Sequence, residues 1–154
     1  MPEFLTERSA DHDMRWHPIL TGCPLPIVED LFENRVIIRV KSEEAELAKY
    51  AHNCFGALKV TYFNMIYEIC NKRGLNYEKV KEGMLLSKLI SPHHTKVPGP
   101  DERLGYGGSC FPKDLDAFLN FLREGEFSGQ KLIENLPSLN QHYREGGKEN
   151  QNAA

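Results

Sequence analysis

The apolar pattern of residues 42–74 constrains the fold of this chain more than any other feature. Apolar side chains recur there three and four residues apart, which is the spacing of one face of an α-helix. They are Ala48, Ala51, Phe55, Leu58, Tyr62, Met65 and Ile69. Ser42 is a good N-cap, Glu43 and Glu44 suit the positive end of a helix, and Gly74 suits a left-handed C-cap. The pattern predicts one helix of roughly thirty residues, about 45 Å long.

A helix of that length is long for a chain of 154 residues. We expect it to span the fold and to offer its apolar stripe to a second subunit, so that the protein forms a homodimer through residues 42–74. Gly56 interrupts the helix at a cost of about 1 kcal/mol relative to alanine. The sequence supplies no packing reason for this glycine.

The remaining pattern predicts a fold that is mainly α, with a small α/β part at the N-terminus. Short strands are expected at 19–21 and 35–40, and further helices at 77–89, 114–124 and 131–144, the last kinked by Pro137. Residues 92–109 form a long loop rich in proline and glycine, which in a small domain is usually functional. The chain thus divides into residues 1–41, a helical domain at 42–144, and a polar tail at 145–154 that we expect to be disordered.

Composition excludes several classes of function. The 19 basic and 22 acidic residues are mixed along the chain, so no basic footprint for nucleic acid or for a membrane surface is present. No apolar run reaches the ~20 residues of a membrane span, and no signal-peptide pattern opens the chain, so we expect a cytoplasmic protein. The four cysteines are widely spaced, which favours reduced thiols over disulfides or a metal site. His93-His94 is interpreted as a loop dipeptide.

The stretch from Gly105 to Asp114, GYGGSCFPKD, carries the clearest chemical signal. Its glycines allow a sharp bend and a close approach to a ligand. Cys110 ends this turn, Lys113 lies close behind it, and Asp114 is expected to open the next helix. A thiol so placed can face a pocket and act as a nucleophile, with Lys113 as a nearby cation. The alternative is a buried, inert cysteine beside an ordinary turn.

Two further pairs of polar residues have helical spacing. Lys49 and Asn53 share one face of the long helix, where an amine and an amide together can donate hydrogen bonds to a developing oxyanion. Glu3 and Glu7 are also four residues apart, which suits a general base or a group that positions water. Solvated surface side chains would give the same pattern in both cases.

Four motifs taken together resemble the UDP-glucose/GDP-mannose dehydrogenase family over roughly residues 2–144. PEFLTE at 2–7 is similar to the family's PEFLxE segment, and AELAKYAHN at 45–53 is similar to its AExxKxxxN helix. VPGP at 97–100 is similar to its substrate loop, and GYGGSCFPKD at 105–114 is similar to its cysteine motif. The last of these motifs is highly specific.

The resemblance implies an activity and a mechanism. Members of the family oxidise the C6 alcohol of a nucleotide sugar to a carboxylate with two NAD⁺. Cys110 would be the nucleophile that captures the aldehyde as a thiohemiacetal and then becomes a thioester. Lys49 and Asn53 would stabilise the oxyanion, and Asp114 and Glu3 would handle the water and proton transfers of hydrolysis.

The resemblance also implies binding residues, a domain organisation and a dimer. Residues 1–41 would be the C-terminal end of a Rossmann-like NAD-binding domain, residues 42–144 the central dimerisation domain, and the long helix the core of the dimer. Lys113 is assigned to cofactor binding, and no residue to a metal. The residues expected to bind the nucleotide sugar are Phe4, Leu5, Glu7, Gly105, Tyr106 and Gly107.

The sequence departs from the family pattern in instructive ways. No GxGxxG follows a strand, so the family's NAD-binding half is expected to lie outside this sequence, as is the second α/β domain. Asp101-Glu102-Arg103-Leu104 and Met65 also differ from many relatives. We therefore predict a partial UDP-sugar 6-dehydrogenase, of the type that converts UDP-glucose to UDP-glucuronate, which is inactive alone. The alternative is a catalytically inactive, truncated relative that acts as a dimerisation or interaction module.

Overall fold

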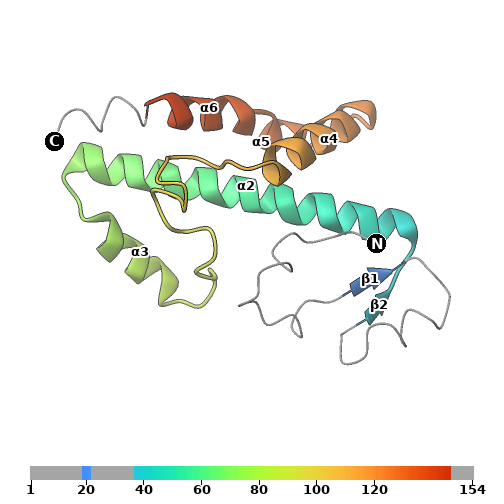
Figure 1. Cartoon of the computed structure of the whole chain (residues 1–154), viewed down its shortest axis with the longest axis horizontal. Helices are drawn as coiled ribbons and strands as arrows, with labels where there is room; N and C mark the ends of the chain where they lie inside the picture. The colour runs from blue at the N-terminus through green and yellow to red at the C-terminus, as the bar shows by residue number, and fades with distance from the viewer. Residues whose placement is uncertain (1–18, 22–36, 147–154) are drawn as a thin grey trace. The chain divides into compact units, whose positions relative to one another are not determined.

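A computed structural model describes residues 19–21 and 37–146 (Figure 1). The chain divides into two compact units, residues 1–51 and 52–154. In the first unit, strand β1 (Ile19–Thr21) pairs in parallel with strand β2 (Ile37–Arg39), and Ile19 lies opposite Ile37. Both strands fall where the β-branched runs predict them. The described residues otherwise form helices and loops, so the fold is mainly α, as predicted.

Helix α2 (Ser42–Arg73) has 32 residues and confirms the long helix. Its start differs slightly from the prediction, because Ser42 is already helical and the backbone N–H of Lys41 donates to the Glu44 carboxylate at 2.6 Å. At its end Gly74 has φ +65°, and Leu75 N–H donates to the Cys70 carbonyl at 2.9 Å. This is the left-handed cap that the glycine predicts.

Four shorter helices complete the second unit, and three of their bounds differ from the predictions. They are α3 (Tyr77–Leu85), α4 (Cys110–Glu124), α5 (Gln130–Glu134) and α6 (Leu136–Gly146). Helix α3 ends before residue 89, α4 begins at Cys110 rather than Asp114, and the last predicted helix is split at Asn135. Pro112 and Pro137 both lie in first turns, where a missing N–H removes no intrahelical bond.

Two apolar cores hold the second unit together, and Figure 1 shows the helices that form them on opposite sides of α2. The first core joins α2 to α4, α5 and α6, and its buried members are Cys54, Ala57, Tyr106, Leu115, Leu119, Leu122, Ile133 and Leu136. The second joins α2 to α3 and the following loop through Phe63, Cys70, Tyr77 and Val97. The loop that leads to Cys110 is thereby fixed to the helical core at Val97 and at Tyr106.

Much of the apolar stripe of α2 is exposed, although Leu58 packs against the first core. Phe55 is 65% exposed, and Tyr62, Met65 and Ile69 are also exposed. Smaller residues such as Ala57 and Thr61 face inward instead, which lets neighbouring elements approach the helix closely. This leaves a large part of the helix's apolar side chains in contact with solvent.

Gly56 has a packing reason that the sequence could not reveal. A Cβ atom at this position would lie 2.6 Å from Cζ of Phe111, well inside van der Waals contact. The glycine therefore allows the Phe111 ring, which comes from the first turn of α4, to rest directly on the α2 backbone. This contact fixes the start of α4 against α2.

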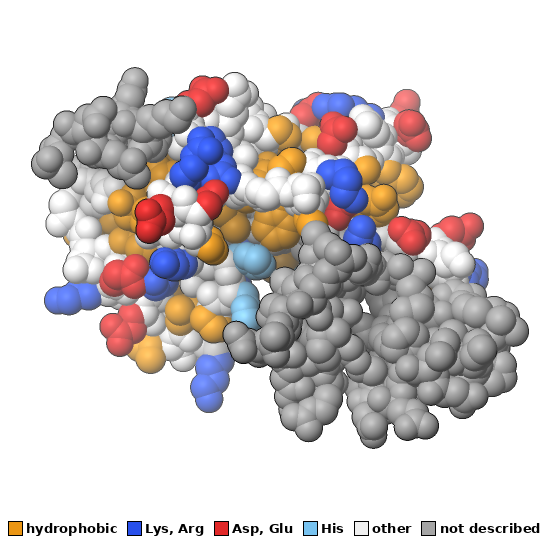
Figure 2. Space-filling model, in the orientation of Figure 1, with side chains coloured by type: hydrophobic (Ala, Val, Ile, Leu, Met, Phe, Trp, Pro, Cys, Tyr) orange, Lys and Arg blue, Asp and Glu red, His pale blue; other side chains and the backbone are white. Residues whose placement is uncertain are grey.

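The charge of the described residues is mixed on the face drawn in Figure 2, and the same residues contain no candidate membrane span. On the face in Figure 2, acidic and basic side chains of the described residues are interspersed. No helix within residues 19–21 and 37–146 is long and apolar enough to cross a bilayer.

Candidate active site

Asn53 of α2 and Asp114 of α4 meet directly, although they are 61 residues apart in the sequence. Asn53 Nδ2 donates to Asp114 Oδ2 at 2.5 Å, and Lys113 Nζ forms an ion pair with Asp114 Oδ1 at 2.8 Å. Asp114 is only 1% exposed. Burial of a carboxylate is expensive unless its oxygens accept such hydrogen bonds. The pair thus connects the polar face of α2 to the start of α4.

Cys110 lies one helical turn before Asp114, on the same face of α4. Residues with this spacing have Cβ atoms about 5–6 Å apart. Cys110 is partly exposed, whereas Cys54 and Cys70 are buried, and all three are free thiols. As the first residue of α4, Cys110 also stands where unpaired backbone N–H groups favour negative charge on a bound group.

A pocket of about 350 Å³ opens beside this turn. Backbone of the glycine-rich loop forms one wall, including Gly105, Gly107 and Gly108, and Phe111 closes the side next to Cys110. Three of the predicted binding residues, Gly105, Tyr106 and Gly107, therefore line one cavity.

His94 lines the same pocket, and sequence reasoning treated it only as part of a loop dipeptide. Its ring lies against Phe111, with ring centroids 5.3 Å apart. Burial chiefly, and the nearby charges of Lys59, His93 and His52, lower the pKa of His94 below its ordinary value. Lys96 lines the same pocket and adds a basic side chain to its wall. No spacing in the sequence links His94 to Cys110.

Lys113 and Lys49 have definite neighbours in the structure. Lys113, which the resemblance assigns to cofactor binding, is ion-paired with Asp114. Lys49 belongs to the first unit, where its Nζ lies 5.5 Å from the centroid of the Tyr50 ring. The predicted residues Glu3, Phe4, Leu5 and Glu7 lie outside the described residues.

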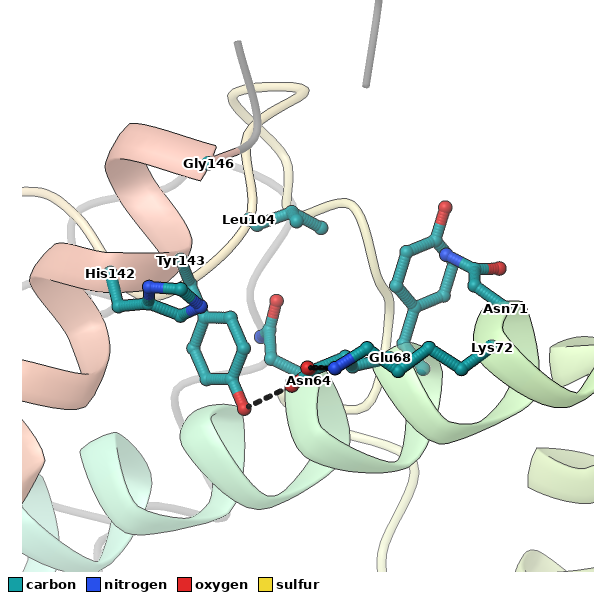
Figure 3. A pocket seen from close by; sticks show the side chains of 9 residues that line it. Asn64, Glu68, Asn71, Lys72, Leu104, His142, Tyr143 and Gly146 are labelled. Carbon is teal, nitrogen blue, oxygen red and sulfur yellow. Dashed lines mark hydrogen bonds and ion pairs between the residues drawn. The ribbon is translucent and has the colours of Figure 1, made fainter. Parts of the chain in front are cut away.

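A second pocket, of about 420 Å³, is lined by α2, α6 and Leu104 and by none of the predicted site residues (Figure 3). Glu68 is central to it: its carboxylate is ion-paired with Lys72 and accepts a hydrogen bond from the Tyr143 hydroxyl at 3.4 Å. Together, the Lys72 ion pair, the Tyr143 hydrogen bond and the nearby His142 hold the pKa of Glu68 below its ordinary value, against the effect of burial. The mutual pairing of these side chains suits a structural role.

Comparison with known proteins gives the family. The sequence model of the UDP-glucose/GDP-mannose dehydrogenase family, central domain, matches residues 43–142. The chain belongs to this dehydrogenase family. The match runs from the first turn of α2 to α6, so it includes every residue that lines the pocket beside Cys110.

Individual relatives agree with the family match. The chain is 35% identical over 150 residues to the UDP-glucose 6-dehydrogenase TuaD of Bacillus subtilis, covering 93% of this chain and 31% of that protein. It is 37% identical over 151 residues to a UDP-glucose 6-dehydrogenase of Rhizobium meliloti, covering 90% and 33%. The chain therefore spans about a third of the length of these relatives.

A solved structure supports the same conclusion. A UDP-glucose dehydrogenase from the archaeon Pyrobaculum islandicum superimposes with a TM-score of 0.71 at 29% sequence identity, over 81% of this chain and 29% of that one. The predicted family and the mainly α fold are both confirmed.

The environments of the thiols in this family member predict selective alkylation. Burial and, to a smaller extent, the Asp114 charge raise the pKa of Cys54 from 9.0 to about 12, so Cys54 stays protonated at neutral pH. Only the thiolate reacts quickly. We expect iodoacetamide at pH 7.5 to label Cys110 at least about tenfold faster than Cys54 or Cys70, as measured by peptide mass spectrometry. Equal rates for the three thiols would contradict a preformed, accessible Cys110.

Proposed function

We propose that this chain carries the covalent chemistry of a UDP-sugar 6-dehydrogenase, acting on UDP-glucose or a close analogue. One observation carries the proposal: folding joins Asn53 to Asp114 at the turn of α4 that follows Cys110. An amide, a carboxylate and an accessible thiol then lie together beside a pocket bounded by a glycine-rich loop. This is the set of groups that acyl chemistry on a cysteine requires.

Cys110 is the nucleophile in this proposal. Its sulfur adds to the C6 aldehyde of the sugar and forms a thiohemiacetal, whose loss of a hydride and a proton gives a thioester. Water then adds to the thioester carbonyl, and collapse releases the carboxylate and regenerates the thiol. A single cysteine thus holds the sugar through the second oxidation and the hydrolysis.

Asn53 and Lys49 are proposed to stabilise the oxyanions of these steps. The Asn53 amide has two N–H donors, and its bond to Asp114 fixes the orientation of the group while leaving the second N–H to point elsewhere. Asp114 is proposed to hold Asn53 in place and to take part in the proton transfers of hydrolysis. A donor that is fixed before the reaction stabilises developing charge without reorganisation.

NAD⁺, when bound, supplies the hydride acceptor for both oxidations. Within the described residues β2 leads into α2 through Val40 and Lys41, without the glycine-rich turn of a dinucleotide cradle. We propose that binding of the cofactor depends on residues other than these.

Exchange of this segment into a full-length relative tests the proposal. Residues 42–146 replace the matching segment of the Bacillus subtilis relative, and the chimera is given UDP-glucose and NAD⁺. We expect NADH and UDP-glucuronate from the chimera, and no NADH from the 154-residue chain alone. A folded chimera that forms neither product would favour the alternative, an inactive dimerisation or interaction module.

The exposed face of α2 supports a homodimer in either case. Phe55, Leu58 and Tyr62 line a shallow pocket of about 430 Å³ with Leu89 and Ile90. Contiguous apolar surface of this kind usually marks an interface. We propose that a second copy of the chain covers this face, in line with the dimer that the sequence predicts.

A single charge in this face should dissociate the dimer. We expect light scattering to give a dimer at micromolar concentration, and Phe55→Glu to give a monomer, because it places a carboxylate in a dry interface. Leu132→Glu is a matched control, since Leu132 on α5 is 64% exposed and Phe55 is 65% exposed. A wild-type monomer, or equal effects of the two variants, would contradict the proposed interface.

A further inference from the structure

Asn140 of α6 pairs with the backbone of the glycine-rich loop in both directions. The Tyr106 N–H donates to Asn140 Oδ1 at 2.7 Å, and Asn140 Nδ2 donates to the Tyr106 carbonyl at 3.1 Å. One amide side chain therefore satisfies both backbone groups of Tyr106, much as a neighbouring strand would. The adjacent Gly105 N–H donates to Asn64 Oδ1 at 2.9 Å, so α2 holds the same turn from its other side.

Arg144, one turn further along α6, joins two parts of the loop. Its Nε donates to the Tyr106 carbonyl at 2.9 Å, and its Nη1 forms an ion pair with Asp101 Oδ2 at 2.6 Å. The Arg144 side chain is 15% exposed and the Asp101 side chain is 49% exposed, so the guanidinium group is the more buried partner of this pair. Asp101 and Tyr106 both line the pocket beside Cys110, and one guanidinium group therefore sets the distance between them.

Two of the loop glycines are explained by these contacts. A Cβ on Gly105 would lie 2.5 Å from Asn140 Oδ1, and a Cβ on Gly107 would lie 1.5 Å from Arg144 Nη2. Gly105 also has a φ of +73°, which by itself favours glycine. Gly108 has a φ of +74°, and a Cβ there would meet nothing within 4 Å, so its backbone conformation alone requires glycine. The absence of a side chain at Gly105 and Gly107 thus lets Asn140 and Arg144 of α6 contact the loop backbone.

The geometry points to Asn140 and Arg144 as positioning residues that set the conformation of the loop before Cys110. The inference rests on the proposed function for its catalytic meaning. The Tyr106 ring lies 6.2 Å from the Phe111 ring, centroid to centroid, and Phe111 is the neighbour of Cys110 and rests on Gly56. Movement of Tyr106 would therefore change the shape of the pocket wall and, through Phe111, the position of the Cys110 thiol.

The test uses the 154-residue chain and two local readouts that need no dehydrogenase activity. These are the amide hydrogen exchange of Tyr106 by NMR and the iodoacetamide rate of Cys110. We expect Asn140→Ala to speed Tyr106 exchange by about fivefold or more, the effect of losing one protecting hydrogen bond. Gln141→Ala is the control, because the exposed Gln141 side chain donates to Glu145 within α6, and its loss should leave both readouts unchanged.

Arg144→Lys separates positioning from general stability. Lysine keeps the charge opposite Asp101 but lacks the planar fork that reaches Tyr106 as well. We expect the melting temperature to stay close to that of the wild type, while the Cys110 rate changes by about threefold or more. Cys110 rates that simply follow the melting temperature would show a structural role only and overturn the inference.

A double-mutant cycle gives the sharpest comparison. Gly107→Ala must displace the Arg144 guanidinium, so it should change the Cys110 rate in the wild type and have little further effect in Arg144→Ala. Gly108→Ala should have the same effect in both backgrounds. Additive effects of Gly107→Ala and Arg144→Ala would overturn the inference. If the chimera were inactive but Gly107→Ala and Arg144→Ala still showed non-additive effects, the proposed function would be wrong and the role of Asn140 and Arg144 in the loop would still hold.

Discussion

We expect Cys110→Ala in the chimera to lower UDP-glucuronate formation by at least about a thousandfold, the scale that follows removal of a covalent nucleophile. Without the sulfur, the aldehyde has no group on which to form the thiohemiacetal, and the second oxidation stops. The measurement is UDP-glucuronate by chromatography, in parallel with NADH absorbance.

The matched control for this variant is Cys70→Ala. Cys70 is a buried thiol of the second core, and its removal should cost stability without stopping the reaction. If Cys110→Ala and Cys70→Ala formed UDP-glucuronate at similar rates, the thiol of residue 110 would not be the nucleophile.

Gly56→Ala should lower the free energy of unfolding by about 1–3 kcal/mol, the usual cost of overpacking a close contact. The sign of this change is informative, because replacing glycine by alanine inside a helix normally raises the free energy of unfolding by up to about 1 kcal/mol. Here the new methyl group would meet the Phe111 ring, with Cβ and Cζ 2.6 Å apart. Urea denaturation followed by circular dichroism measures the change.

Gly83→Ala provides the matched control for that experiment. Gly83 lies inside α3, and a Cβ there meets nothing within 4 Å, so alanine should stabilise the chain. Gly56→Ala should also be partly rescued by Phe111→Leu, which removes the ring edge. Stabilisation by Gly56→Ala would show that Phe111 does not rest on α2.

The sequence predicted those helices and strands whose formation depends on neighbouring residues in the chain. The three- and four-residue spacing and the Gly74 cap were sufficient for α2, which ends at Arg73 as expected. The sequence prediction began a helix at Asp114, after Pro112, and placed Pro137 as a kink inside one helix over residues 131–144. In both cases the proline lies in a first turn, where it is compatible with a helix, so α4 begins earlier and α6 begins at Leu136.

The site could be predicted only in part, since its contacts join distant residues. The motif identified Cys110 and Asp114, and helical spacing identified Asn53, but periodicity does not say that Asn53 and Asp114 share a hydrogen bond. Asn140 and Arg144 carry no local signal, because they bond to the backbone of Tyr106, which lies 34 and 38 residues earlier in the chain. The same holds for Gly56, whose reason lies on another helix.

The most direct test looks for a covalent adduct on the Cys110 sulfur. The chimera is quenched with acid during turnover of UDP-glucose and NAD⁺, and its peptides are analysed by mass spectrometry. We expect the peptide that contains Cys110 to carry the mass of a UDP-glucuronyl thioester, and the adduct to disappear as hydrolysis completes. Product formation in a single turnover with no adduct on that peptide, or with the adduct on another cysteine, would contradict covalent catalysis by Cys110.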